Sequence, residues 1–95
     1  MNKEDKIKIM QQAIKHYGNP NQVEKAIEEV GELMHELLEV AVNSRSNKKG
    51  MITEIADVTI MLEQLKMIFE ISEEEHEAEI EFKLNRLKTR MEVLK

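Results

Sequence analysis

The sequence has no cysteine and no tryptophan, and its 95 residues include only one proline, three glycines, one tyrosine and two phenylalanines. Without cysteine, neither a disulfide framework nor a thiolate metal site can form, which agrees with a reducing, cytoplasmic setting. Because aromatic residues make up only 3% of the chain, the base-stacking platforms of RNA-binding sheets are not expected. There is no long apolar run, so the sequence predicts neither a signal peptide nor a membrane-spanning helix.

Charged residues are abundant, at 35% of the chain, and the formal net charge is −5. Such an acidic chain is a poor partner for nucleic acid, because the phosphate backbone attracts basic surfaces. The helix formers Glu, Lys, Leu, Met and Ala are frequent while Gly and Pro are scarce, which indicates an all-α fold. The length corresponds to a single domain, 1–95, whose small core makes a homodimer or homotetramer a reasonable expectation.

Four segments carry apolar residues at the three- and four-residue spacing of an amphipathic helix. Their approximate ranges are 3–16, 21–43, 51–69 and 72–94. Residues 43–50 are polar and rich in loop formers, which predicts a mobile surface loop. Because this loop is short, the second and third helices are expected to pack antiparallel, as the central hairpin of a four-helix protomer. The third segment is apolar over most of its circumference, which is typical of a central helix.

Local signals predict where these helices begin and end. Gly18 suits a position just past a helix end, and Pro20 cannot continue a helix. In a capping box, a polar side chain and a glutamate three residues later each bond the other's backbone N–H. Two such pairs are expected to begin the second and fourth helices: Asn21 with Glu24, and Ser72 with Glu75.

Two carboxylates interrupt the apolar third segment. On a helical wheel Glu54 lies amid apolar residues, and Asp57 lies beside Met61. Because an unpaired buried carboxylate is costly, each of them needs a base, a proton or a metal ion. On the second segment, Glu29 and Glu32 lie on one side of the helix, at the edge of its apolar stripe. In an antiparallel hairpin the two pairs face each other, and four oxygen donors suit Mg²⁺ or Mn²⁺.

The ExxE spacing alone does not select these residues. It also occurs in Glu36 with Glu39 and in Glu74 with Glu77, and most such pairs lie on solvated helix faces. A non-catalytic helical interaction protein, in which the carboxylates form ion pairs with Lys or Arg, is therefore an alternative. The apolar surroundings of the carboxylates in the third segment favour the metal site.

The sequence contains a paired ExxE and ExxD motif, in Glu28-Glu29-Val30-Gly31-Glu32-Leu33 and in Glu54-Ile55-Ala56-Asp57-Val58. This pair resembles the signature of the MazG-like, all-α nucleoside triphosphate pyrophosphohydrolases. The resemblance covers most of the chain, because the helix order and the short length also fit. Gly31 suggests a close approach of another backbone or a ligand, since glycine is unfavourable in the middle of a helix.

The resemblance implies an enzyme that hydrolyses a nucleoside or deoxynucleoside triphosphate to the monophosphate and pyrophosphate, as nucleotide-pool housecleaning. It implies Mg²⁺ as the cofactor, with Mn²⁺ as a possible substitute, held by Glu29, Glu32, Glu54 and Asp57. Glu32 and Glu36 are the candidates for orienting the attacking water. Rival readings are a related enzyme acting on dUTP, dCTP or phosphoribosyl-ATP, and a catalytically idle relative that senses nucleotides.

Substrate contacts are also implied by the resemblance. Family members often carry Lys and Arg three residues apart on the last helix, against the substrate phosphates, and Lys83 and Arg86 have this spacing. The alternative for these two is a solvated basic face near a helix C-terminus. Tyr17 and Gln22 are candidates for contacting the base or sugar, because the first helix can cover the site in this family; a packing tyrosine is the alternative for Tyr17.

Overall fold

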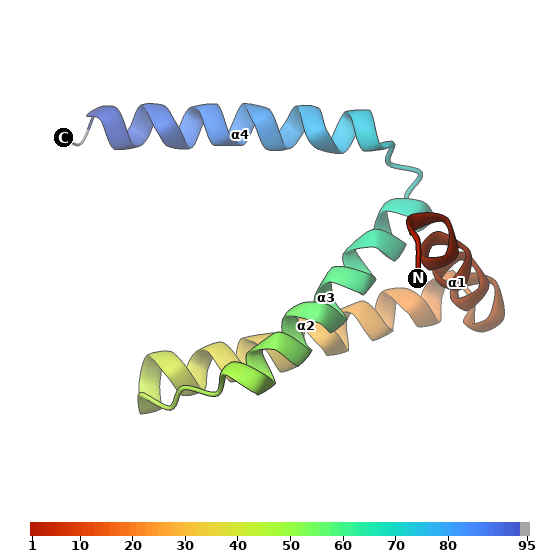
Figure 1. Cartoon of the computed structure of the whole chain (residues 1–95), viewed down its shortest axis with the longest axis horizontal. Helices are drawn as coiled ribbons and strands as arrows, with labels where there is room; N and C mark the ends of the chain where they lie inside the picture. Colours follow the sequence, from red (N-terminus) through yellow and green to blue (C-terminus); the bar gives the residue numbers. More distant parts are fainter. Residues whose placement is uncertain (94–95) are drawn as a thin grey trace.

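The computed structural model describes residues 1–93, which form four helices connected by short turns (Figure 1). The helices are α1 (Lys3–Tyr17), α2 (Asn19–Asn43), α3 (Lys48–Ile68) and α4 (Glu73–Val93). The part of the chain described contains no strand, so the all-α prediction is confirmed. α2 and α3 run antiparallel, α1 packs against both near the start of α2, and α4 extends away from the other three. Among these helices none combines the length and apolar character that crossing a bilayer requires.

The boundary between α1 and α2 differs from the prediction. Gly18 separates the two helices with φ at 88°, a conformation that glycine adopts without strain. α2 begins directly after it, with Pro20 in its first turn, where a missing backbone N–H costs nothing. The predicted capping box of Asn21 and Glu24 is therefore wrong. The side-chain nitrogen of Asn21 instead donates to the carbonyl oxygen of Tyr17 at 2.7 Å.

The connection between α2 and α3 is shorter than the sequence suggested. It comprises only residues 44–47, because α3 begins at Lys48 rather than near residue 51. Asn47 caps α3, and its Oδ1 accepts a hydrogen bond from the backbone N–H of Gly50 at 3.0 Å. An N-cap bond of this kind satisfies one of the first N–H groups of the helix. For this reason the polar residues 48–50 belong to α3 rather than to the loop.

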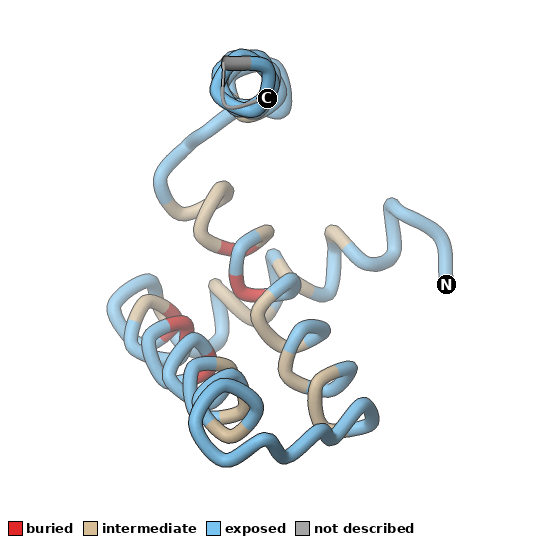
Figure 2. The backbone as a smooth tube through the Cα atoms, turned by 90° about the vertical axis from the view of Figure 1, so that its left-hand side faces the viewer, coloured by how far each residue is buried: buried red, intermediate tan, exposed pale blue. Residues whose placement is uncertain are grey.

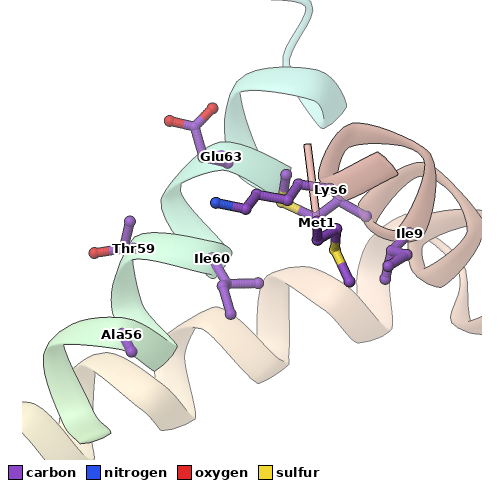
Figure 3. A pocket seen from close by; sticks show the side chains of 8 residues that line it. Met1, Lys6, Ile9, Ala56, Thr59, Ile60 and Glu63 are labelled. Carbon is purple, nitrogen blue, oxygen red and sulfur yellow. The ribbon is translucent and has the colours of Figure 1, made fainter. Parts of the chain in front are cut away.

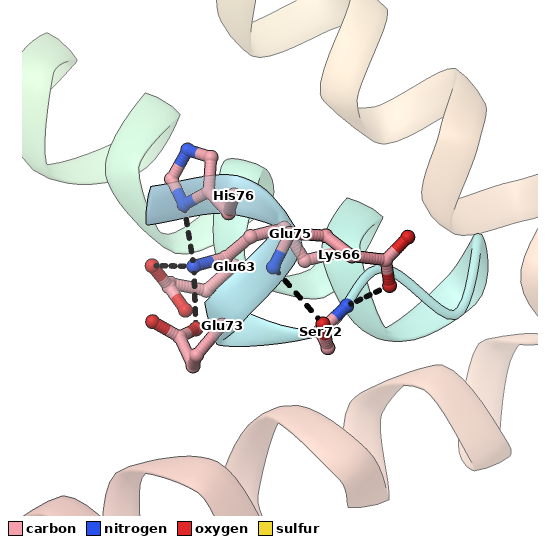
Figure 4. Close-up of polar contacts among 6 residues, drawn as sticks. All are labelled: Glu63, Lys66, Ser72, Glu73, Glu75 and His76. Carbon is pink, nitrogen blue, oxygen red and sulfur yellow. Dashed lines mark hydrogen bonds and ion pairs between the residues drawn. The ribbon is translucent and has the colours of Figure 1, made fainter. Parts of the chain in front are cut away.

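The direction of α4 is set at its first turn (Figure 4). The predicted capping box is confirmed: Ser72 Oγ accepts from the Glu75 N–H at 3.1 Å, and Glu75 Oε1 accepts from the Ser72 N–H at 3.0 Å. Lys66 of α3 lies 2.8 Å from Glu73 Oε1 and 3.3 Å from His76 Nδ1. Beyond this turn, α4 packs on no other helix of the described residues. The predicted helix end at Leu94 lies outside the described residues.

Burial is concentrated where α2 and α3 face each other (Figure 2). Among residues 1–92, the buried ones are two apolar residues, Ala26 and Met61, and three polar residues, Gln22, Glu29 and Gln64. Gln22 Nε2 donates to Gln64 Oε1 at 2.6 Å, so an amide pair bridges the start of α2 and the end of α3. The contact between these helices is therefore polar to an unusual degree for so small a core.

The expectation that α3 is a central, covered helix is not met within one chain. Ile52, Ile55 and Leu62 are each more than half exposed. The apolar stripe of α4 is also exposed, at Ile80, Leu84, Leu87 and Met91. Both observations have one cause: α4 leaves the hairpin and covers none of its apolar surface.

An apolar hollow of about 560 Å³ lies between α1 and α3 (Figure 3). Met1, Ile9 and Ile60 are among the side chains that line it. The whole chain has an accessible surface of 7895 Å², whereas a compact monomer of this mass exposes about 5,700 Å². The radius of gyration is 16.5 Å, compared with about 12 Å for a compact domain of this length. A single chain therefore leaves an unusually large surface uncovered.

Candidate metal centre

Four carboxylates from α2 and α3 converge in the middle of the hairpin. One oxygen each from Glu29, Glu32, Glu54 and Asp57 lies within 4.8 Å of the corresponding oxygens of the other three. Each helix contributes two residues three positions apart, which places both on one side of that helix. The structure thus brings together the four residues that the paired motif predicted.

The antiparallel register explains why these four meet. Gln22 of α2 is bonded to Gln64 of α3. Glu29 follows Gln22 on α2 by seven residues, or about two helical turns. Asp57 precedes Gln64 on α3 by the same number. Because two turns return a side chain to nearly the same face, the amide pair and the carboxylates lie on one shared surface of the hairpin.

Two carboxylate oxygens in this group are buried and have no hydrogen-bond partner. They are Oε2 of Glu29 and Oε2 of Glu54. Glu29 is only 7% exposed, and its other oxygen, Oε1, lies 3.1 Å from Lys25 Nζ. Buried charged oxygens are normally paired or bound to a metal, since leaving them without a partner is costly. These two unpartnered oxygens belong to a set made only of oxygen donors, which could hold a metal ion that prefers oxygen ligands.

Electrostatic repulsion within the group acts on Glu54. Burial is the main cause that raises the pKa of Glu54 above its ordinary value of 4.5. The charges of Glu32 and Asp57 are the next largest causes, and those of Glu29 and Glu36 add to them. Without a cation, the folded protein therefore resists full ionisation of this group.

Lys25 is the base nearest to the four carboxylates. Its hydrogen bond to Glu29, followed by the charge of Glu28, raises the pKa of Lys25 above 10.5. Lys25 also lies 3.7 Å from Glu28, on the exposed side of α2. Within the described residues no Lys or Arg forms an ion pair with Glu32, Glu54 or Asp57. Ion pairing accounts for one of the four carboxylates and leaves the other three uncompensated.

Glu36 lies one turn beyond Glu32 on α2. It is half-buried, and it stands outside the four-carboxylate group, although its charge acts on Glu54. The other member of that ExxE pair, Glu39, has its own partners, with Oε2 at 3.9 Å from Arg45 and 3.3 Å from Asn43. This pair therefore does not form a second site of the same kind.

A second acidic group lies at the start of α4, formed by Glu73, His76 and Glu77. The ammonium of Lys66 already contacts Glu73 and His76 (Figure 4). This lysine is itself only 12% exposed at its side chain, and its pKa is raised first by the hydrogen bond to Glu73. A resident ammonium supplies the positive charge there, so this group has a different role from the one in the hairpin.

The substrate-contact candidates fall into two sets. Gln22 and Tyr17 lie near the hairpin, and both line a pocket next to Lys25. Lys83 and Arg86 lie on the exposed body of α4: Lys83 Nζ is 3.7 Å from Glu79, and the Arg86 guanidinium lies 5.9 Å from the centre of the Phe82 ring. Within one chain α4 does not pack on the hairpin, so the structure does not bring these two bases to the carboxylates.

No backbone of the described residues closely approaches Gly31, and the approach of a ligand stays a prediction. A Cβ atom placed on Gly31 would meet nothing within 4 Å, so the surface beside the motif is open.

Sequence reasoning missed two residues of this surface, Lys25 and Gln64. Both follow from helix periodicity: Lys25 is four residues before Glu29, and Gln64 is seven after Asp57. A buried glutamine on an apolar helix is the same kind of signal as a buried glutamate, because it too requires a partner.

Comparisons of the chain with family models, curated proteins and solved structures find no match.

Replacing Glu54 by Gln tests the cost of an ionised Glu54, from burial first and from the neighbouring carboxylates second, in the metal-free protein. Because the folded-state pKa of Glu54 is raised, wild-type protein loses stability as the pH rises through that pKa. Glu54→Gln is therefore expected to melt at a higher temperature than wild type at pH 7 in a chelator. The difference should shrink as the pH falls below 4.5, where Glu54 becomes protonated in both the folded and the unfolded state. An identical melting temperature at pH 7 contradicts the cost of ionising Glu54 in the folded protein.

Adding Mg²⁺ tests the cation site. At a free Mg²⁺ concentration a hundred times its Kd, wild-type protein should gain about 2.7 kcal/mol of stability, seen as a higher melting temperature. Asp57→Asn should lose most of this gain. The matched control is Glu74→Gln, which removes an exposed carboxylate of the same ExxE spacing and should respond like wild type. A protein paired only by its own bases would show no Mg²⁺ response.

Proposed function

We propose that the protein is a MazG-like, Mg²⁺-dependent nucleoside triphosphate pyrophosphohydrolase. It hydrolyses a nucleoside or deoxynucleoside triphosphate to the monophosphate and pyrophosphate, and serves as a nucleotide-pool housecleaning enzyme of the cytoplasm. The observation that carries the proposal is the convergence of four carboxylates in which two buried oxygens, Glu29 Oε2 and Glu54 Oε2, have no partner. A structural ion-pair network would leave no such oxygens unpaired.

The four carboxylates have distinct roles in this mechanism. Glu29 and Glu54, which each have a buried oxygen without a partner, would hold the cation, and Asp57 would be a third ligand. When bound, Mg²⁺ neutralises phosphate charge and lowers the pKa of a water molecule. Glu32 is the exposed member of the group, so it is best placed to accept a proton from the attacking water. Glu36, one turn away, is the second candidate for orienting that water.

Positioning and charge neutralisation suffice for such a reaction, because phosphoryl transfer needs little covalent chemistry from the protein. The carboxylate group supplies the first requirement and the cation it holds supplies the second. The remaining phosphate charge calls for bases, and the pair that the resemblance assigns to this role, Lys83 and Arg86, lies on the extended α4. Contact with the site would require α4 to approach a hairpin, its own or that of another copy.

A homodimer or homotetramer meets this requirement and covers the exposed apolar surface. One chain exposes about 2,200 Å² more than a compact monomer of its mass. This excess exceeds the area of roughly 800 Å² that each partner buries in a standard interface, and lies in the range of permanent dimers. The stripe of Ile80, Leu84, Leu87 and Met91 is one face that association would cover.

Pyrophosphate release tests the catalytic proposal. With Mg²⁺ and a panel of ribonucleoside and deoxyribonucleoside triphosphates, wild-type protein is expected to release pyrophosphate and the monophosphate from at least one of them. Glu54→Gln and Asp57→Asn should lower kcat/KM by on the order of 100-fold or more, as when one preorganised electrostatic group is removed. Release of orthophosphate would indicate cleavage at a different bond.

The matched control for this assay is again Glu74→Gln, which should keep wild-type activity. No turnover of any nucleotide contradicts the enzyme proposal, as does full activity in Glu54→Gln. If nucleotides bind with Mg²⁺ but pyrophosphate never appears, the protein is a nucleotide sensor instead.

Light scattering tests the oligomer. The measured mass should be two or four times the 11.1 kDa protomer mass, as expected for a homodimer or homotetramer. Leu84→Glu places a charge in the apolar stripe of α4 and should shift the protein toward smaller species, since burying an unpaired charge is costly. Asn85→Glu adds the same charge at a neighbouring position outside the stripe and should leave the mass unchanged. A wild-type monomer at micromolar concentration contradicts the association.

A further inference from the structure

A second pocket lies on the same surface of the hairpin as the carboxylates. Its volume is about 490 Å³, within the range of small-molecule sites. It lies where the end of α1, the start of α2 and the end of α3 meet, and it is lined by Tyr17, Asn21, Gln22, Lys25, Met61 and Gln64.

The polar groups of this pocket are mostly neutral amides. Lys25 is its one charged residue, and its ammonium is engaged by Glu29 at 3.1 Å. Gln22 and Gln64 are 7% and 4% exposed and are joined by one hydrogen bond, from Gln22 Nε2 to Gln64 Oε1. That bond leaves the oxygen of Gln22 and the nitrogen of Gln64 without a partner among the described side chains. The pocket is therefore lined by a free amide acceptor on α2 and a free amide donor on α3, and a ligand can reach both.

Such a pair matches the edge of a nucleobase better than a phosphate. Glutamine amides bind bases because each base edge carries hydrogen-bond donors and acceptors in a fixed pattern. A phosphate carries only acceptors and a strong negative charge, and is normally bound by Arg, Lys or a cation. The side chain of Tyr17, 58% exposed, adds an aromatic ring at the same pocket.

The distance between the pocket and the carboxylates suits a nucleotide. Gln22 precedes Glu29 by seven residues and Gln64 follows Asp57 by seven, so the amide pair lies about 10 Å along the helices from the carboxylates. This is comparable to the reach from the phosphates of a nucleotide, across its sugar, to its base. Lys25 stands between the two ends, adjacent to both.

We propose that the paired amides of Gln22 and Gln64 bind the base of the nucleotide and determine which base is accepted. The role of this pair rests on the proposed function, because it assumes that the phosphates lie at the carboxylates. A bound base displaces water from the free amide oxygen and nitrogen. A base that does not replace those hydrogen bonds loses affinity, since a desolvated polar group then has no partner.

Equilibrium binding in Mg²⁺ tests this role. The probes are α,β-methylene analogues of four deoxynucleoside triphosphates, which resist cleavage, and inorganic triphosphate, which has no base. Wild-type protein should bind at least one analogue about tenfold or more tightly than inorganic triphosphate, with a clear order among the bases. The double variant Gln22→Met/Gln64→Met should lose that excess affinity and that order, while its affinity for inorganic triphosphate stays within about twofold.

Replacing both glutamines avoids leaving one buried amide unpaired, so the double variant is expected to fold. Gln11→Met, at an exposed position of α1, is the matched control and should bind every probe like wild type. A third measurement needs no variant: the side-chain NH₂ resonances of Gln22 and Gln64 should shift with the preferred analogue but not with inorganic triphosphate.

The outcomes separate the two proposals. If wild type binds inorganic triphosphate as tightly as every analogue, or if the double variant keeps the order among the bases, the base-binding role is wrong and the metal and phosphate site stands. Resonances of both glutamines that ignore the preferred analogue also overturn the role. If neither inorganic triphosphate nor any analogue binds in Mg²⁺, both the proposed function and the base-binding role are wrong.

Discussion

The antiparallel packing of α2 against α3 is the constraint on which the site depends. It places two carboxylates of each helix opposite two of the other, within 4.8 Å, where like charges repel. Lys25 compensates one of them and no other base of the described residues pairs with the rest. The hairpin therefore holds a concentrated negative charge that two helices alone do not stabilise. A cation bound between them would stabilise both the charge and the helix pairing at once.

The same packing explains how much of the site could be predicted. Helix periodicity places residues three or seven apart on one face, so the four carboxylates could be grouped from the sequence once the hairpin was assumed. Gln64 obeys the same period, but an uncharged amide on an apolar helix is a weaker sign of a buried partner than a carboxylate is. The helix starts were less predictable, because both helices begin earlier than the sequence indicated. Pro20 lies inside the first turn of α2, which has no side-chain cap, whereas Asn47 caps α3 ahead of its apolar residues.

The course of α4 was not predictable from periodicity. Its stripe at Ile80, Leu84 and Leu87 indicates an apolar partner but not which one. The direction of α4 is set by the turn before it, through the contact of Lys66 with Glu73 and the capping box of Ser72. With these contacts α4 points away from its own hairpin. Apolar faces of both α3 and α4 are exposed in consequence, and the bases Lys83 and Arg86 are separated from the carboxylates. If the chain acts on nucleotides, association and catalysis are expected to be linked.

Cation binding by the carboxylates of the hairpin is tested most directly by the anomalous scattering of Mn²⁺ in crystals of the protein. We expect a strong anomalous peak between α2 and α3, with oxygens of Glu29, Glu54 and Asp57 at metal–oxygen distances of about 2.0–2.2 Å. Glu54→Gln crystals should show a much weaker peak at the same place. A hairpin with no peak at saturating Mn²⁺, its carboxylates contacted instead by a lysine or arginine, would contradict the account.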